Sequence, residues 1–184
     1  MRSLNKDEYL LCSMQARLFE KSVDELNYSS YIFIRRFMNS HVATIFDEEK
    51  YLYISMPYKE VYEELDDEYG KSEYGSKKIP SLVMHWIGYI YRFISIRCGI
   101  PSKKIYKLFP VNFLLEVYNG FHTMNPAIVI EKMAEIKNID LDSFPDKVYF
   151  YDNYIEPSDK QKRIIEDNLK KGLEILKRLK LEDK

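Results

Sequence analysis

The sequence contains few of the residues from which catalytic and metal centres are usually built. Its 184 residues include three histidines, two cysteines and a single tryptophan. Cys12 and Cys98 lie far apart without a CxxC pair, and His41, His85 and His122 have no ligand partner at metal-binding spacing. The motifs HEXXH, DXDXDG and GXXXXGK[ST] are absent as well. We therefore predict no metal site, no cofactor and two reduced thiols.

The sequence also lacks a strong excess of charge and an apolar leader. The formal net charge is -1 at pH 7, so no global field draws the protein to nucleic acid or to a membrane. The first residues, MRSLNKDEYLL, are charged where a signal peptide requires an apolar core. The apolar run 79–100 is interrupted by His85, Arg92 and Arg97, and a charge at a bilayer centre costs about 3 kcal/mol. We predict a cytoplasmic protein without membrane contact.

Tyrosine and phenylalanine are abundant instead. Hydrophobic residues make up 46% of the chain and charged residues 31%, which is typical of a folded domain. Sixteen tyrosines and ten phenylalanines supply aromatic rings, and tyrosine joins an apolar ring to a polar tip. This excess predicts many half-buried positions or a contact surface.

Helical patterns run along the chain up to residue 138. Apolar residues recur at helical spacing, and Ser, Asn, Pro and Gly stand where helices begin and end. The predicted helices cover residues 6–26, 29–46, 57–70, 80–99, 102–109, 110–120 and 125–138. Ser102 is expected to cap the helix that ends at Phe109. We predict an all-α fold, a compact domain of six or seven helices around the apolar helix 80–99, with residues 1–138 forming the domain.

Residues 139–184 differ in character and form a predicted C-terminal arm. Pro145 and Pro157 flank a short alternating aromatic run, 148–151, that could form a strand or an extended arm. Ser158 then precedes an amphipathic helix with a leucine stripe, which must be covered by the domain, by a second copy or by a partner.

The stretch HWIGYIYR, residues 85–92, places polar groups within the central helix. His85, Gly88, Tyr89 and Arg92 follow at i, i+3, i+4 and i+7 and form one narrow seam, while Trp86 is expected in the core. An unpaired charge on such a helix would be costly. We therefore predict that Arg92 pairs with a carboxylate, either of Glu116 or of the acidic block 63–68.

Charge is segregated along the sequence. Residues 47–73 hold ten acidic residues and three lysines, whereas residues 74–115 hold seven basic residues and no acidic one. The acidic block is typical of a solvated helix face, and it could also dock onto a basic cleft. Lysines interleaved with Tyr106, at Lys103, Lys104 and Lys107, are compatible with phosphate contact.

Three motifs together resemble a known family. HWIGYIYR, then SKKIYKLF, then FHTMNPAIVIEKM are similar to a family of small helical bacterial proteins, and FIRRFMNSHVA and VYEELDDEYG extend the resemblance over roughly residues 5–137. The family pattern often has aspartate where Asn125 stands here, and both residues can cap a helix. The resemblance implies an antitoxin-like partner encoded beside a toxin, including toxins of the ADP-ribosyltransferase type.

Three hypotheses for function follow. The first is a non-enzymatic protein-binding module, an antitoxin that binds a cognate toxin directly, with a homodimer as a further option. The second is a ligand-binding or enzymatic domain that uses His85, Arg92 and His122, and the third is a DNA-binding regulator. We predict no catalytic residue. The candidate residues for binding a partner or ligand are His85, Tyr89, Arg92, His122, Thr123, Tyr149, Tyr151, Tyr154, Leu169, Leu173 and Leu176.

Overall fold

The protein is all-helical. A computed structural model describes residues 4–48 and 56–141, all of which belong to the first of two units of the chain, Met1–Tyr149. These residues form eight α-helices and no strand. The helices are α1 (Lys6–Glu25), α2 (Ser30–Asn39), α3 (His41–Asp47), α4 (Tyr58–Tyr69), α5 (Ser81–Cys98), α6 (Ser102–Leu108), α7 (Val111–Phe121) and α8 (Pro126–Lys137). The predicted fold class is confirmed, and the predicted C-terminal arm and amphipathic helix lie outside the described residues.

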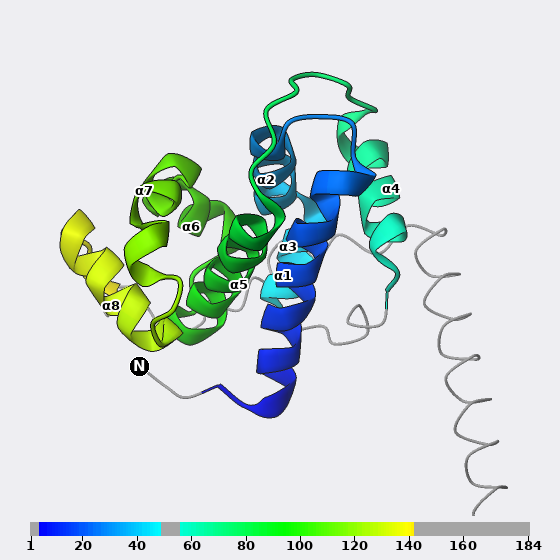
Figure 1. Ribbon diagram of the computed structural model, residues 1–184. Coiled ribbons are helices and arrows are strands. Elements are labelled where there is room, and N and C mark those ends of the chain that lie inside the picture. The colour runs from blue at the N-terminus through cyan, green and yellow to red at the C-terminus, as the bar shows by residue number, and fades with distance from the viewer. Residues whose placement is uncertain (1–3, 49–55, 142–184) are drawn as a thin grey trace, which may run out of the picture. The chain divides into compact units, whose positions relative to one another are not determined.

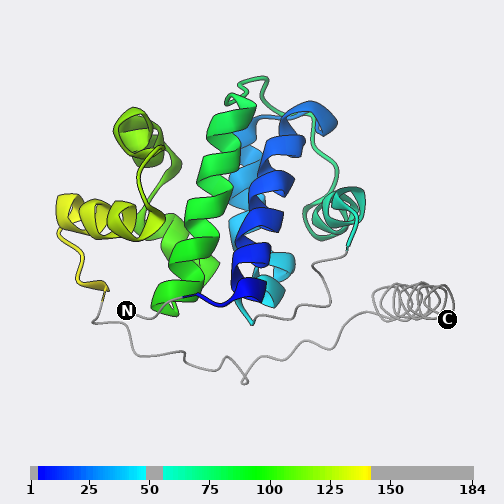
Figure 2. The ribbon, with the colours of Figure 1, turned by 60° about the horizontal axis from the view of Figure 1, so that its bottom comes forward.

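Helices α1 and α5 form the centre of the described domain and lie side by side in opposite directions (Figures 1 and 2). The helices α2, α3 and α6 pack against this pair, and α4 covers the outer side of α2 and α3. Helices α7 and α8 pack against α5. The predicted central position of α5 is therefore confirmed, with α1 as its main neighbour.

A cluster of aromatic rings within the core joins the first four helices. Phe19 of α1 lies 5.1 Å from the rings of both Phe33 and Phe37 of α2, in edge-to-face geometry. Phe37 in turn contacts Phe46 of α3, and Phe33 contacts Tyr62 of α4. Burial of each ring contributes about 2–3 kcal/mol, and edge-to-face pairs add a fraction of that amount.

Helix boundaries follow the predicted signals, with two corrections. The single helix predicted over 29–46 is two helices, because Ser40 adopts an extended conformation and its hydroxyl oxygen accepts a hydrogen bond from the backbone N–H of Ala43. The predicted cap Ser102 is instead the first residue of α6, and Pro101 holds the cap position. The remaining predicted helices match the structure to within a few residues.

Trp86 is also placed differently from the prediction. Its side chain is half-buried at the edge of α5 and packs against Tyr118 of α7, with ring centroids 5.4 Å apart. The fully buried positions of α5 are taken by Ile87 and Ile94 and also by the large side chains of Tyr91 and Arg92. None of the helices within residues 4–48 and 56–141 is both long enough and apolar enough to cross a membrane.

Candidate functional site

The predicted seam of α5 faces α1 for most of its length. Gly88 makes this close approach feasible, since a Cβ atom at position 88 would lie 2.8 Å from the backbone oxygen of Gln15 and 2.9 Å from the Phe19 side chain. The Gln15 side-chain amide donates a hydrogen bond to the Gly88 carbonyl at 3.1 Å. The seam is thus the contact between two central helices rather than an open pocket.

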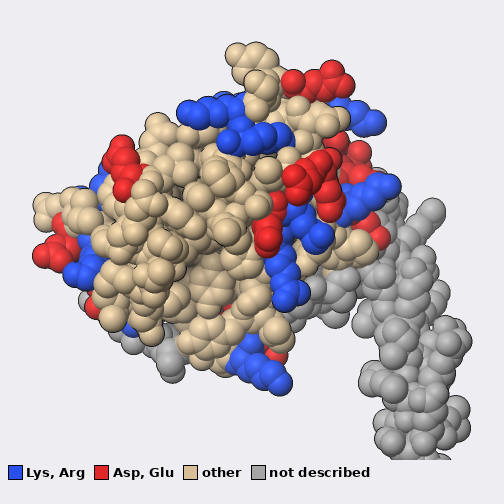
Figure 3. Space-filling view, in the orientation of Figure 1, with Lys and Arg blue, Asp and Glu red and all other residues tan. Residues whose placement is uncertain are grey.

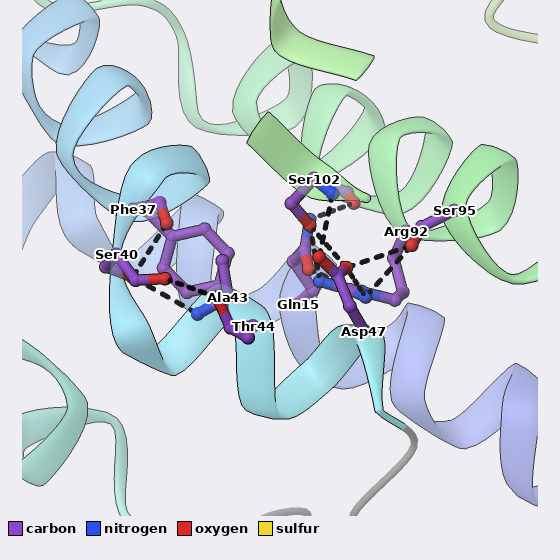
Figure 4. A network of polar contacts seen from close by, with 10 residues as sticks. Gln15, Phe37, Ser40, Ala43, Thr44, Asp47, Arg92, Ser95 and Ser102 are labelled. Carbon is purple, nitrogen blue, oxygen red and sulfur yellow. Dashed lines mark hydrogen bonds and ion pairs between the residues drawn. The ribbon is translucent and has the colours of Figure 1, made fainter. Parts of the chain in front are cut away.

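Arg92 forms the centre of a buried polar network that joins four helices (Figure 4). Its Nε donates to the Gln15 side-chain oxygen at 2.8 Å, and its Nη1 donates to the Asp47 carboxylate at 2.7 Å and to the Ser95 hydroxyl at 3.3 Å. Its Nη2 donates to the Ser102 hydroxyl at 3.0 Å. These partners lie on α1, α3, α5 and α6.

Asp47 is equally well satisfied within this network. Its Oδ1 accepts hydrogen bonds from the hydroxyls of Ser95 and Ser102 in addition to Arg92, and its Oδ2 accepts from the backbone N–H of Ser102 at 2.8 Å. Ser102, at the start of α6, is therefore held by both its backbone and its side chain. This explains why a serine that was predicted to cap its own helix instead bonds to α3.

The prediction that Arg92 pairs with a carboxylate is confirmed, but the two candidate partners that we named were wrong. The partner is Asp47 at the end of α3, rather than Glu116 or the acidic block 63–68. The Arg92 side chain has no exposed surface, and its Nε, Nη1 and Nη2 are all engaged by protein groups. The network therefore stabilises the packing of the helices and leaves this guanidinium unsuited to a ligand.

The two candidate histidines have separate partners. His85 Nδ1 lies 2.8 Å from Glu20 Oε2 of α1, and both side chains are about two-fifths exposed. His122 is exposed after the end of α7, where its Nδ1 donates to the Tyr118 carbonyl at 3.0 Å. Its ring stacks on Tyr118 at 4.7 Å. Thr123 is exposed in the turn that follows.

Next to the seam, α5 presents an apolar stripe to solvent between α1 and α7. Leu82, Trp86, Tyr89 and Phe93 follow at i, i+4, i+7 and i+11, which places them on one side of the helix. Leu82 is 72% exposed, Trp86 and Tyr89 are half-buried, and Phe93 is buried.

Rings from the neighbouring helices extend this stripe into a surface. Tyr9 of α1, which is 45% exposed, lies 6.3 Å from the Phe93 ring, and Phe93 stacks on Tyr89 at 6.0 Å. On the other side, Trp86 contacts Tyr118, which stacks on His122. We name this surface the aromatic face, and it consists of Tyr9, Leu82, Trp86, Tyr89, Tyr118 and His122.

The surroundings of the aromatic face carry little charge. In Figure 3 the surface over α5 is almost free of Lys, Arg, Asp and Glu atoms, whereas charged atoms gather at the left edge, over α8. Burial raises the pKa of Tyr89 to about 12, so its hydroxyl stays neutral at physiological pH. At its border, His85 and Glu20 bond to each other between α1 and α5, and the Arg97 guanidinium lies 6.0 Å from the Phe93 ring.

The predicted binding residues thus fall into three sets. Tyr89 and His122 lie on the aromatic face, His85 borders it and Thr123 follows it, whereas Arg92 is buried in the network. The remaining candidates, Tyr149, Tyr151, Tyr154, Leu169, Leu173 and Leu176, lie outside the described residues. Leu82, Trp86, Tyr9 and Tyr118 were not predicted as binding residues, although the spacing of 82, 86, 89 and 93 already contained the stripe.

Cys12 and the metal-ligating residue types are two separate cases. Burial raises the pKa of the Cys12 thiol to about 12, so this cysteine stays protonated and unreactive. Within residues 4–48 and 56–141, no group of three His, Cys, Asp or Glu side chains could hold a metal ion.

Comparisons with known proteins give no match to a family model, to a curated protein or to a solved structure. The function must therefore be inferred from the geometry of the chain itself.

Proposed function

We propose that this protein is a non-enzymatic binding module that attaches to a protein partner through the aromatic face. The observation that carries the proposal is an uncharged aromatic surface on three helices, with Leu82 72% exposed and Trp86 and Tyr89 half-buried. Contiguous exposed apolar surface marks interaction sites on otherwise polar proteins. Tryptophan and tyrosine also dominate the binding energy of protein interfaces.

The tight packing of α5 against its neighbouring helices supports a binding role for the aromatic face. The seam beside the stripe is fixed to α1 by the close contact at Gly88 and to α3 and α6 by the Arg92 network. The rings are therefore presented on a fixed scaffold, and little conformational entropy would be lost when a partner binds.

In its specific form, the proposal is that the protein is an antitoxin that occludes a toxin enzyme encoded beside it, possibly one of the ADP-ribosyltransferase type. This form rests on the resemblance of the HWIGYIYR, SKKIYKLF and FHTMNPAIVIEKM motifs. The predicted arm would supply a second contact through Tyr149, Tyr151 and Tyr154 and through the leucines 169, 173 and 176. The ligand-binding alternative loses support, since Arg92 is engaged by the protein and His85 and His122 have separate partners.

The test is co-expression with the products of the adjacent genes, followed by growth assays and purification of a complex. Leu82→Glu places a charge on the aromatic face, and we expect it to lower affinity at least a hundredfold and to abolish neutralisation. Its fold should be unaffected, because an exposed substitution changes stability by about 0.5 kcal/mol or less. Thr44→Glu, which adds the same charge at an exposed position of α3, is the matched control.

A chain that ends at Asn138 tests the arm in the same assay, and we expect it to bind more weakly than the full chain. Unchanged binding by Leu82→Glu would contradict the role of the aromatic face. Absence of a complex with any adjacent product would contradict the antitoxin proposal as a whole.

A further inference from the structure

The loop between α4 and α5 holds an exposed tyrosine in a fixed position. This loop, residues 70–80, is named here the Tyr74 loop, and the Tyr74 side chain is 80% exposed. This loop is about twice as long as the typical connection of 4–6 residues, and long loops often carry binding residues.

The loop is held against α2 and its N-cap Ser29 by hydrogen bonds along its length. At its beginning, Arg36 Nη1 donates to the Gly70 carbonyl at 2.9 Å. In the middle, the backbone N–H of Ser29 donates to the Tyr74 carbonyl at 3.3 Å. Toward its end, the Lys77 carbonyl accepts from the Ser30 N–H at 3.1 Å and from the Ser29 hydroxyl at 3.1 Å.

Gly75 completes this arrangement. It adopts a φ of +78°, and a Cβ atom there would lie 3.0 Å from the Cβ of Ser29. Position 75 therefore favours glycine, because the backbone conformation is left-handed and there is little space for a side chain. The loop thus presents Tyr74 on a preformed backbone, which lowers the entropic cost of using this residue in an interface.

The charge around the ring is mainly positive. Lys71, Lys77 and Lys78 are exposed on the loop, with Glu73 as its single acidic residue. Lys77 Nζ lies 5.1 Å from the centre of the Tyr31 ring, and Lys78 Nζ donates to the Leu26 carbonyl at 2.6 Å. These contacts hold two of the ammonium groups close to the loop. In Figure 3, Lys and Arg atoms gather at the top of the molecule, beside this loop.

We propose that the Tyr74 loop is a further contact element for the protein partner, and that it fits an acidic surface with a pocket for an aromatic ring. The inference rests on the proposed function, because it assigns further surface to the same partner. Carboxylates on the partner would face Lys71, Lys77 and Lys78 and supply the complementary charge. The ring would supply the buried anchor that protein interfaces use most often.

A protein fits this surface better than a nucleic acid does. The Tyr74 loop follows directly on α4, which exposes Glu63 and Glu68, and Glu73 lies beside the tyrosine itself. A nucleic acid carries regularly spaced negative charge along its length and would meet these carboxylates as it crossed the surface. A protein can restrict its carboxylates to the positions that face the lysines.

The experiment measures binding of the full chain to the adjacent-gene product that forms the complex, by calorimetry at low and high salt. We expect Tyr74→Ala to weaken binding at least about tenfold and Tyr74→Phe to retain most of the affinity. Lys77→Glu should weaken binding mainly at low salt, because salt screens exposed charges. Lys103→Glu, which makes the same change of charge at an exposed position of α6, is the matched control.

The outcomes distinguish the proposal for the Tyr74 loop from the proposed function. If Tyr74→Ala and Lys77→Glu bind normally while Leu82→Glu does not, the loop proposal is wrong and the proposed function stands. If the wild-type chain binds no adjacent product, both proposals fail together. A fluorescent single-stranded DNA is tested in parallel, and Tyr74-dependent binding to it in place of the protein would overturn the choice of partner. Melting temperatures of all variants should match that of the wild type, since the Tyr74 side chain is largely exposed.

Discussion

The guanidinium of Arg92 lies in the middle of a helical core, where an unpaired charge would cost several kcal/mol. It is tolerated because Gln15, Asp47 and Ser102 supply acceptors from three other helices. Charge-assisted hydrogen bonds of this kind also require defined directions. The network therefore fixes the arrangement of α1, α3, α5 and α6. Hydrophobic packing alone would specify this arrangement less strictly.

At the residue scale, we predict that Arg92→Ala lowers the free energy of unfolding by about 3–5 kcal/mol, because it leaves the Asp47 carboxylate uncompensated in a mostly buried site. The measurement is urea denaturation followed by circular dichroism. Arg35→Ala, at an exposed position of α2, should change stability by about 0.5 kcal/mol or less. A loss below about 1 kcal/mol for Arg92→Ala would show that the network contributes little to the fold.

At the scale of elements, the antiparallel pair of α1 and α5 positions the aromatic face. Contacts between Glu20 and His85, between Gln15 and Gly88 and between Tyr9 and Phe93 run in opposite order along the two helices. Because α1 covers one side of α5 and α7 another, the stripe that begins at Leu82 is left between them.

Gly88 provides the test of this close packing. We predict that Gly88→Ala lowers stability by about 1–2 kcal/mol, since the added Cβ would meet the backbone oxygen of Gln15 at 2.8 Å, and overpacking outweighs the gain in helix propensity. Gly120→Ala is a matched control, because this glycine of α7 has no neighbour within 4 Å of the added atom and its replacement should leave stability equal or raise it by up to about 1 kcal/mol. Both are measured by thermal and urea unfolding, and equal effects would argue against the close approach of α1 and α5.

At the scale of the whole molecule, several weak acids are buried in their neutral form. Burial raises the pKa values of Cys12 and Tyr89 to about 12, and it also raises those of Tyr62 and Tyr91. A raised pKa in the folded state means that folding favours the protonated group. The stability from these groups is complete below their unfolded pKa values, near 9 to 10, and is lost as the pH rises toward 12.

We therefore predict that the free energy of unfolding falls steeply between about pH 9 and pH 12. Urea titrations across this range should show the fall, and Tyr89→Phe should reduce it because the ring remains while the titrating hydroxyl is removed. A stability that is constant up to pH 12, or that Tyr89→Phe leaves unchanged in its pH dependence, would contradict this account.

Local signals in the sequence determined the fold class and most helix boundaries. Proline at 80 and glycine at 99 delimit α5, and Asn125 followed by Pro126 marks the start of α8, because caps and fixed backbone angles act within a few residues. The charge of Arg92 on an apolar helix also determined that a carboxylate had to be its partner.

Only the tertiary structure decided which carboxylate that was and where the exposed face lay. Asp47 is 45 residues from Arg92, and Gln15 is 77 residues away, so no local pattern connects them. Likewise, the sequence contained the stripe of Leu82, Trp86, Tyr89 and Phe93, but an apolar stripe is equally suited to a core. Whether it is buried depends on which neighbours pack against it, and here α1 and α7 cover the two sides and leave most of the stripe partly open to solvent.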